Sequence, residues 1–402
     1  MISRREFFKT SALAAAGLAA AGLDWSKQDP PGRIRKDGMS FRRLGRTGLY
    51  LSEVSLGGSP LPDWPLFLQI IERGVNYIDT SHNYDNGNSE RQIGRLFKEI
   101  GRDKVNVGTK FHVERSLSEQ SIIRSAEGSL RRLGTDRVDV LLIHGAENPD
   151  HLTDERVLNA FDKLKKEGKC RFTGLSCHAN HTAVVGRAAD CGRYDMVQVG
   201  FNVFDINGPA QDVETYGDYL GRSGLAGLLK RAVSKEVGVI AMKTLKVGGR
   251  RQNLAKYKTG TVSLQQAMLK WVLENKNVTS AVTEMLNQEQ MEEDLAVAGT
   301  SLTKAERHKL YRYVAENSRD TCRMCGACQA SCPRGIPITG ILRGLAYWEN
   351  YGKMERAREA VREVGARQAI KRCLDCGSCE SACPYRISVR RKLGEARSLL
   401  SI

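Results

Sequence analysis

The chain has 402 residues, of which 41% are hydrophobic and 11 are cysteine, and its formal net charge is +16. That length exceeds one small core and predicts two or three domains of a soluble globular protein. Residues 321–402 hold fifteen Lys or Arg against seven Asp or Glu, which is half of the excess charge. Few aromatic residues accompany them, which disfavours nucleic-acid binding. These basic residues could instead offset the negative charge of thiolate groups in the same segment, or form a docking surface for an acidic redox partner.

The N-terminus joins a basic segment to a short apolar run. SRREFFK at 3–9 precedes an alanine-rich stretch at 12–23, which is shorter than the roughly 20 apolar residues of a membrane span. Paired arginines before such a run predict a cleavable twin-arginine signal, and a Sec signal or a disordered basic tail is the alternative. We expect residues 1–36 to comprise this signal and a polar linker.

The twin-arginine route moves folded proteins, so cofactors that are inserted in the cytoplasm cross with the chain. The sequence therefore predicts a periplasmic or other extracytoplasmic location, with the twin-arginine export machinery as a partner. We expect no stable membrane span.

From 37 to 300 the chain alternates strand-like apolar runs with amphipathic segments. A hairpin signal at 45–48 precedes a first strand that ends at Gly57 and Gly58. Seven more strand candidates follow, at 76–81, 105–110, 138–145, 171–178, 196–202, 238–244 and 279–285. Most are short and continuously apolar, as buried parallel strands are.

The intervening segments have helical patterning. Ser116 and Glu119 are candidates for a capping box, and Gly134 and Gly168 suit helix ends. Eight strand–helix units in about 260 residues predict an α/β fold, the (β/α)8 TIM barrel, over 37–300. A doubly wound sheet is the alternative, but no G-x-G-x-x-G follows the first strand, so a Rossmann site is unsupported.

Polar residues stand at the ends of three consecutive strand candidates. Asp79 ends the second, with Tyr84 five residues on, Lys110 ends the third, and His144 ends the fourth. Each alone is also an ordinary packed residue, but chemistry in TIM barrels lies at these strand ends. Together they predict an acid site in which Lys110 lowers the pKa of Tyr84 from about 10. Asp79 would hold Lys110, and His144 would orient a carbonyl oxygen.

At these residues the chain resembles the aldo/keto reductase family. NYIDTSHNYDNGNSERQIG at 76–94 is similar to its aspartate–tyrosine segment, and LRRLGTDRVDVLLIHG at 130–145 is similar to the segment with its histidine. The resemblance covers about 41–300 and implies a nicotinamide-dependent carbonyl reductase or alcohol dehydrogenase. It implies that Tyr84 donates the proton, that Lys110 and Asp79 tune it, and that His144 orients the substrate.

The resemblance also implies where a nicotinamide would bind. Ser176 and Gln198 match contacts to its carboxamide, whereas Cys177 stands where the family has asparagine. Met242 stands where the family commonly has an aromatic residue, and its sulfur can pack on the ring.

At the adenosine end the resemblance implies contacts from Glu293 and Asp294. Gln290 stands where NADP-preferring members often have arginine, and Lys243 could supply a charge to a 2′-phosphate. NAD and NADP therefore both stay open.

Two C-x2-C-x2-C-x3-C-P runs begin at Cys322 and Cys373. This is the ferredoxin spacing for two [4Fe–4S] clusters, in which the fourth cysteine serves the other cluster. The predicted ligand sets are Cys322, Cys325, Cys328 and Cys383 for one cluster, and Cys332, Cys373, Cys376 and Cys379 for the other. Zinc is the alternative, disfavoured roughly tenfold because it normally takes two C-x2-C pairs. The remaining three cysteines make an odd total, which argues against a disulfide framework.

We expect a connecting helix at 301–320 and a two-cluster domain at 321–402. The forty residues at 333–372 have helical composition, so the module resembles the helical ferredoxin domain of succinate dehydrogenase iron–sulfur subunits. The expected architecture is thus a (β/α)8 barrel followed by a small, mainly α-helical ferredoxin-like domain.

The leading hypothesis is an exported oxidoreductase that transfers hydride between a retained nicotinamide dinucleotide and a carbonyl or alcohol substrate. Clusters pass single electrons, whereas a nicotinamide takes two electrons at once as hydride, and the sequence shows no flavin signature that would connect the two. The clusters therefore serve a redox partner protein, or they are structural, or the barrel catalyses a reaction that differs from the family's usual one. The alternative is an electron-transfer or ligand-binding subunit whose barrel does not turn over. A purely structural protein would leave the polar site residues without a purpose.

Overall fold

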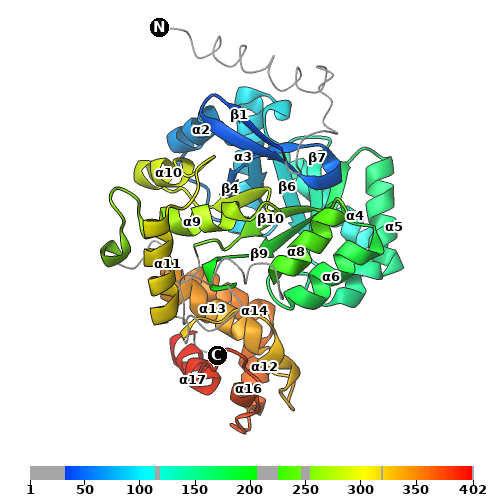
Figure 1. Ribbon diagram of the computed structural model, residues 1–402. Coiled ribbons are helices and arrows are strands. Elements are labelled where there is room, and N and C mark those ends of the chain that lie inside the picture. Colours follow the sequence, from blue (N-terminus) through cyan, green and yellow to red (C-terminus); the bar gives the residue numbers. More distant parts are fainter. Residues whose placement is uncertain (1–31, 114–117, 206–224, 246–253, 318–319, 401–402) are drawn as a thin grey trace.

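The computed structural model describes residues 32–113, 118–205, 225–245, 254–317 and 320–400. Figure 1 shows a strand barrel inside a ring of helices, with a helical C-terminal domain at one end. Residues 1–31 of the predicted signal and linker lie outside the described residues. Within the described ranges, no helix combines the length and the apolar character that crossing a bilayer requires.

Eight parallel strands close the barrel in the order β10–β11–β4–β5–β6–β7–β8–β9. Their bounds are β4 (Val54–Gly57), β5 (Tyr77–Asp79), β6 (Asn106–Phe111), β7 (Val138–Ile143), β8 (Cys170–Cys177), β9 (Met196–Gly200), β10 (Gly238–Met242) and β11 (Ser280–Thr283). Each overlaps a predicted strand, so the TIM barrel is confirmed and the doubly wound sheet is wrong. Every residue of β7 is buried, because helices cover the outside and side chains fill the inside.

Helices follow the strands on the outside of the barrel. Their bounds are α2 (Trp64–Glu72), α3 (Asn88–Ile100), α4 (Glu119–Leu133), α5 (Glu155–Lys166), α6 (His181–Cys191), α8 (Leu225–Ser234), α9 (Leu264–Glu274) and α10 (Gln288–Leu295). Short 3-10 turns lie at η2 (Gly45–Thr47), η3 (Tyr84–Gly87), η4 (Arg102–Lys104), η5 (Pro149–Thr153), η6 (Val203–Asp205) and η7 (Ala255–Tyr257).

The start of α4 differs from the sequence expectation. Its capping box joins Ser118 and Ser121, and each hydroxyl accepts from the backbone N–H of the other residue. Of the expected pair, Ser116 lies outside the described residues, and Glu119 is the first residue of the helix and takes no part in this box. A serine at the third helical position can reach back as a glutamate does. Gly134 ends the helix at a φ of 61°, as expected.

A three-stranded antiparallel sheet of β1 (Arg33–Lys36), β2 (Met39–Arg43) and β3 (Tyr50–Ser52) covers the end of the barrel where the strands begin. Figure 1 shows β1 at the opposite end from the C-terminal domain. We expected residues 33–36 in the linker, but they pair with β2. The sequence expectation was wrong here because Arg33 has a distant partner, the buried carboxylate of Glu53.

Glu53 ties this sheet to the barrel. Its Oε1 accepts from Arg33 Nε at 2.6 Å and from Arg42 Nε at 2.5 Å, and its Oε2 accepts from the N–H of Gly299 at 2.5 Å. Arg42 also donates to the carbonyl of Val278 at 2.7 Å, just before β11. The carboxylate thus joins the N-terminal sheet to the last barrel unit.

The C-terminal domain is helical, as predicted, and begins after the connecting helix α11 (Lys304–Asn317), which ion-pairs with α9 through Lys270 and Glu306 at 2.9 Å. Its elements are α12 (Ala327–Ala330), α13 (Ile338–Tyr351), α14 (Met354–Glu363), α15 (Ala366–Ala369), η9 (Ile370–Arg372), α16 (Ser378–Ser381) and α17 (Val389–Leu400). Ile341, Leu345 and Leu393 belong to a core that is separate from the barrel core.

We predict that Glu53→Gln destabilises the protein by about 3–5 kcal/mol at pH 7, because it leaves the buried Arg42 guanidinium without its counter-charge. Burial would raise the pKa of Glu53, but Arg42, the Gly299 N–H and Arg33 bring it below its ordinary value. This stabilisation is therefore present above the unfolded-state pKa of about 4.3 and is lost as the pH falls through the lower folded-state value.

Denaturant unfolding of both proteins under anaerobic conditions measures the difference, which should shrink towards acid pH. The matched control is Glu236→Gln, which removes an exposed partner of Arg43 and should change stability by less than about 1 kcal/mol. Equal stability of Glu53→Gln and Glu236→Gln would contradict the proposed role of Glu53.

Candidate functional sites

The four predicted acid-site residues meet at the end of the barrel where the strands finish. Asp79 is the last residue of β5, Lys110 lies near the end of β6, and His144 directly follows β7. Lys110 Nζ lies 2.6 Å from Asp79 Oδ1 and 3.5 Å from the hydroxyl of Tyr84. The rings of Tyr84 and His144 meet edge to face, with centroids 5.7 Å apart.

The turn after β5 positions Tyr84. Asp85 and Asn86 adopt left-handed backbone angles, with φ near 50°, and Gly87 follows at 80°. Asn and Asp tolerate this region better than other non-glycine residues. This turn ends directly at α3, so the first residue of the turn, Tyr84, is held over the barrel mouth between the second strand and its helix.

Burial dominates the electrostatics of this site. It lowers the pKa of Lys110, against the opposing charge of Asp79. Burial and the Asp79 carboxylate together raise the pKa of Tyr84 well above its ordinary value. We expected Lys110 to lower that pKa, and this was wrong, because burial and the Asp79 carboxylate, 2.6 Å from Lys110 Nζ, outweigh the ammonium charge. Tyr84 is therefore a neutral phenol at pH 7.

His144 is a neutral imidazole. Burial lowers its pKa well below the ordinary value, and the neighbouring His112 and Lys110 lower it further. Ser81 Oγ lies 3.1 Å from its Nδ1. When the Ser81 hydroxyl donates to Nδ1, the ring proton is on Nε2, which can then donate a hydrogen bond to a carbonyl oxygen.

Sequence reasoning missed the other histidines of this mouth. The ring of His112 stacks on His144 with centroids 4.4 Å apart, and His178 lies 5.8 Å from His144. Both directly follow barrel strands, so the strand-end argument that found His144 could have found them too. The Nδ1 of His178 is buried and has no hydrogen-bond partner among the described residues.

The predicted nicotinamide contacts form one group on β8, β9 and β10. Met242 Sδ lies 3.8 Å from Ser176 Oγ and 3.7 Å from Gln198 Nε2. The buried Oε1 of Gln198 has no hydrogen-bond partner within the described part of the chain. A buried acceptor is costly unless it is paired, so these residues fit the N–H of a ligand carboxamide.

The adenosine-end residues lie apart from that group, on α10. Gln290 Oε1 accepts from the backbone N–H of Leu286 at 2.9 Å, and Glu293 and Asp294 follow on the same helix. Lys243 does not support the suggested phosphate contact, because its Nζ donates to the hydroxyl of Tyr347 at 2.6 Å. The C-terminal domain holds this ammonium at the barrel mouth.

The C-terminal domain covers the mouth, which the sequence did not predict. Arg356 of α14 lies with its Cζ 5.9 Å from the ring centre of Tyr84 and 5.4 Å from that of Tyr347 on α13. Arg343 of α13 bonds Glu147, which follows β7, at 3.2 Å. A cavity of about 330 Å³, its open side included, lies between the two domains. It is lined by His178, Lys243, Met324, Arg343, Ala346, Tyr347, Asn350 and Tyr351.

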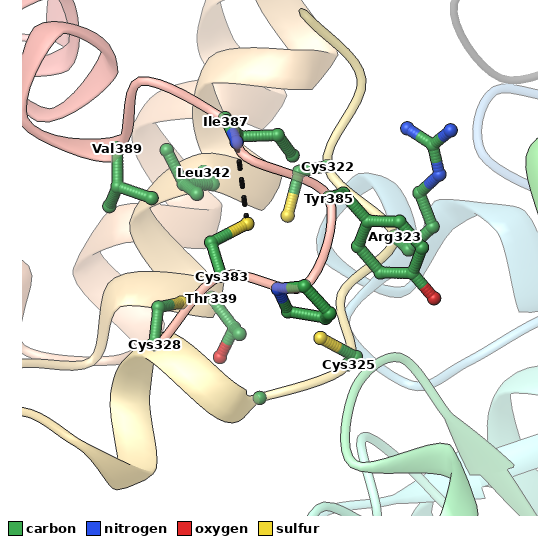
Figure 2. Close-up of a pocket in the computed structure, with 12 residues that line it drawn as sticks. Cys322, Arg323, Cys325, Cys328, Thr339, Leu342, Cys383, Tyr385, Ile387 and Val389 are labelled. Carbon is green, nitrogen blue, oxygen red and sulfur yellow. Dashed lines mark hydrogen bonds between the residues drawn. The ribbon is translucent and has the colours of Figure 1, made fainter. Parts of the chain in front are cut away.

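The cysteines gather in two sets with the predicted membership. Figure 2 shows the sulfur atoms of Cys322, Cys325, Cys328 and Cys383 around a common space of about 310 Å³, its open side included. A second space of about 360 Å³ is lined by Cys332, Cys373, Cys376 and Cys379. The last cysteine of each run thus lines the cavity of the other run, although ligation itself stays a prediction.

Both cysteine loops have the same backbone shape. Met324 and Gly326 have φ values of 58° and 85°, and Asp375 and Gly377 repeat them at 51° and 78°. In the first set the N–H of Met324 donates to Cys322 Sγ at 3.4 Å. Figure 2 also shows the N–H of Ile387 donating to Cys383 Sγ, at 3.5 Å. Such N–H groups stabilise thiolate charge.

Each cysteine set offers four sulfur atoms around one space. Among the described residues, no three His, Cys, Asp or Glu side chains are arranged to hold one metal ion. Each thiolate of a [4Fe–4S] cluster binds a different iron, so its ligands surround a space and do not converge on a point. Four sulfur atoms around a cavity are consistent with that arrangement.

Comparison with known proteins finds two families along the chain. The Aldo/keto reductase family matches residues 66–313, and a 4Fe-4S dicluster domain matches residues 315–384. A putative voltage-gated potassium channel subunit beta of Schizosaccharomyces pombe is 32% identical over 213 residues, which are 44% of this chain and 59% of that protein. L-galactose dehydrogenase of Arabidopsis thaliana is 28% identical over 297 residues, 64% of this chain and 88% of that protein.

The chain spans about half to three fifths of the length of most of the curated relatives it matches. Among solved structures, an aldo-keto reductase from Klebsiella pneumoniae in complex with NADPH superposes with a TM-score of 0.52 at 23% identity. The match covers 68% of this chain and 95% of that one. At this identity the likeness shows the barrel fold.

We predict that cluster spectra show the fourth cysteine of each run acting on the cluster of the other run. Cys383→Ala should perturb the same cluster as Cys325→Ala, and Cys332→Ala the same cluster as Cys376→Ala, because each pair lines one cavity. Electron paramagnetic resonance of the reduced, anaerobically purified variants, with iron analysis, makes the comparison. Cys191→Ala, outside both cavities, is the control and should leave both signals intact. If Cys383→Ala instead altered the signal that Cys376→Ala alters, the assignment would be wrong.

Proposed function

The chain belongs to the aldo/keto reductase family, and on this premise we propose that it transfers hydride between a bound nicotinamide dinucleotide and a small carbonyl or alcohol substrate. The observation that supports the proposal most is the convergence of Tyr84, Lys110, Asp79 and His144 at one barrel mouth. A proton donor, a charge to hold it, and an imidazole to orient oxygen are what carbonyl reduction needs besides hydride.

In this mechanism His144 donates a hydrogen bond from Nε2 to the substrate oxygen and polarises the carbonyl. Hydride for the carbonyl carbon would come from a nicotinamide held by Ser176, Gln198 and Met242. As the oxygen becomes an alkoxide, which is more basic than a phenolate, Tyr84 gives it the hydroxyl proton. Lys110, 3.5 Å away, then stabilises the phenolate of Tyr84.

Three residues are proposed to hold the nicotinamide. The unpartnered Oε1 of Gln198 and the hydroxyl of Ser176 would bind the carboxamide, and the sulfur of Met242 would pack on the ring. Gln290, Glu293 and Asp294 on α10 would bind the adenosine end. With Lys243 bonded to Tyr347 and a neutral amide at Gln290, the choice between NAD and NADP stays open.

We propose that the clusters transfer electrons between a redox partner and the barrel mouth. Met324, between two cysteines of the first set, also lines the cavity between the domains, and Arg323 donates to the Phe204 carbonyl at 3.1 Å. Figure 1 shows α16, which carries Cys379 of the second set, at the end of the molecule away from the barrel. Cys373 and Cys376 of this set are exposed, as is Cys325 of the first set.

The export proposal depends on the N-terminal sequence alone. The paired Arg4 and Arg5 before an alanine-rich run support a twin-arginine signal and an extracytoplasmic location. A protein that works there would carry its dinucleotide across, because free nucleotides are scarce outside the cytoplasm.

A second candidate is an electron-transfer or ligand-binding subunit whose barrel does not turn over. The observation that favours it is the cover over the mouth, where Arg356 and Tyr347 lie over the acid site. The two candidates differ in whether Tyr84 changes a reaction rate.

We predict that Tyr84→Phe lowers carbonyl reduction by about 100- to 10,000-fold, because the alkoxide loses its proton donor. Bound dinucleotide and cluster spectra should be unchanged. The measurement is an anaerobic screen of small aldehydes, ketones and alcohols in both directions, with the protein's nucleotide content determined in parallel. Tyr50→Phe, on β3 at the other end of the barrel, is the matched control. Undiminished turnover in Tyr84→Phe, or no turnover by the unmodified protein with any substrate, would favour the second candidate.

A further inference from the structure

A second tyrosine–lysine pair lies at the same mouth. Tyr347 on α13 accepts from Lys243 Nζ at 2.6 Å, and this ammonium also lies 4.5 Å from the ring centre of Tyr347. The pair parallels that of Tyr84 and Lys110, but it joins the two domains: the lysine follows β10 and the phenol comes from the cluster-bearing domain.

The surroundings of the two phenols differ in charge. Charged and titratable groups near Tyr347 are Lys243 after β10, His178 after β8, Tyr84 after β5, Glu147 after β7, Arg343 on α13, and Arg356 and Glu363 on α14. The carboxylates of Glu147 and Glu363 are bonded to Arg343, at 3.2 and 3.3 Å, and Glu359 and Glu363 on α14 pair with Arg356. Lys243 has no such carboxylate partner among the described residues. Tyr347 itself therefore faces cations, whereas Tyr84 faces Asp79.

These surroundings separate the pKa values of the two phenols. Burial would raise the pKa of Tyr347, but Lys243, Arg356 and Arg343 overcome it and bring that pKa to about 7. Burial and Asp79 instead keep the pKa of Tyr84 far above neutrality. Two titratable groups pushed apart in this way are typical of an acid and a base that work together.

We propose that Tyr347 is the proton-exchanging residue that reprotonates Tyr84 between turnovers. The proposal rests on the proposed carbonyl reduction. Arg356 links the two phenols, since its Cζ lies 5.9 Å from the ring centre of Tyr84 and 5.4 Å from that of Tyr347. After Tyr84 gives its proton to the alkoxide, the O–H bond of Tyr347 would break, a solvent molecule at the mouth would carry the proton, and the O–H bond of Tyr84 would re-form. This transfer is favourable, because the proton moves from Tyr347, the more acidic phenol, to the phenolate of Tyr84, the stronger base. Lys243 then stabilises the Tyr347 phenolate until solvent returns a proton. No electron moves in this step.

A titration of tyrosinate absorbance tests the proton exchange directly. Difference spectra between the cluster-loaded protein and Tyr347→Phe, at equal iron content, should show one tyrosinate forming around pH 7. Lys243→Met should move that transition up by about 1–3 pH units, because the nearest cation is lost. Absence of the transition overturns the proposal whether or not the protein turns over any substrate.

Turnover supplies the second readout. Tyr347→Phe should lower carbonyl reduction about tenfold or more and remove a pH dependence near 7, and Tyr50→Phe should do neither. If the tyrosinate titrates near pH 7 but Tyr347→Phe keeps the rate and pH profile of the unmodified protein, the relay is wrong. Lack of turnover in every variant, with the titration intact, would instead count against carbonyl reduction.

An independent surface carries a second inference, at the outer cysteine set. Leu374, between Cys373 and Cys376 in the chain, has 57% of its surface exposed. Arg334 and Leu374 line the cavity of this cysteine set, and Lys371 and Arg372 directly precede Cys373 in the chain. All three of these cations are exposed. None of these three cations has a salt bridge within the described residues, whereas the nearby Arg390 is paired with Glu380 at 2.9 Å.

We propose that this surface docks an acidic one-electron carrier protein. The unpaired cations supply charge complementarity, and the exposed leucine supplies an apolar contact beside the exposed Cys373 and Cys376. An electron would pass from the reduced carrier to the outer cluster, so the carrier is oxidised by one electron and the cluster is reduced by one.

Stopped-flow reduction of the cluster-loaded protein by a reduced acidic flavodoxin tests the docking. The double variant Lys371→Glu/Arg372→Glu should lower the second-order rate about tenfold or more at low salt, and added salt should erase the difference. Lys163→Glu/Lys166→Glu on α5 makes the same charge change far from the cysteines and is the control. Equal slowing in both double variants, or none in either, would overturn the proposed surface.

Discussion

A buried ammonium organises the carboxyl end of this barrel. Lys110 is 1% exposed, so its charge is tolerable only with close partners, and it has them in the Asp79 carboxylate at 2.6 Å and the Thr80 carbonyl at 2.7 Å. Because Asp79 ends β5 and Thr80 follows it, while Lys110 lies near the end of β6, the ion pair fixes how two neighbouring strands finish. Burial, with Asp79 adding to it, leaves Tyr84 a neutral phenol, and burial, with His112 and Lys110 adding to it, leaves His144 a neutral imidazole. The chemistry available at the mouth follows from that neutrality.

The second constraint is the contact between the domains. Lys243 after β10 and Arg356 on α14 make a cationic cluster around the phenol of Tyr347 on α13, so three elements meet there. Helix α13, which lines the first cysteine cavity through Thr339 and Leu342, also carries Tyr347 at the barrel mouth. A barrel site and a cluster site that share a wall can respond to each other, whereas two domains on a flexible tether could not. This shared wall is why we propose electron transfer over a purely structural role for the clusters.

Local patterns in the sequence predicted much of this architecture, and long-range contacts account for what it missed. Buried parallel strands are continuous apolar runs, so all eight barrel strands could be predicted. The spacing of the cysteines also predicted which four of them line each cavity. Strand β1 was missed because Arg33 is held by Glu53, twenty residues away. The direction of the pKa of Tyr84 was wrong because residue types do not show how deeply Tyr84 is buried or how close Asp79 lies to Lys110. Nothing in the sequence near Tyr347 or Arg356 shows that they lie over a barrel strand end, since only the packing of the domains brings them there.

The central claim is that the cluster-bearing domain forms part of the barrel's active site. An anaerobic crystal structure of the cluster-loaded protein with its dinucleotide bound tests this most directly. The account predicts that the nicotinamide lies against Ser176, Gln198 and Met242 while Tyr347 stays bonded to Lys243 and Arg356 stays over Tyr84. A structure in which the helices α13 and α14 have left the mouth, with Lys243 free of Tyr347 and bound to the dinucleotide, would contradict it.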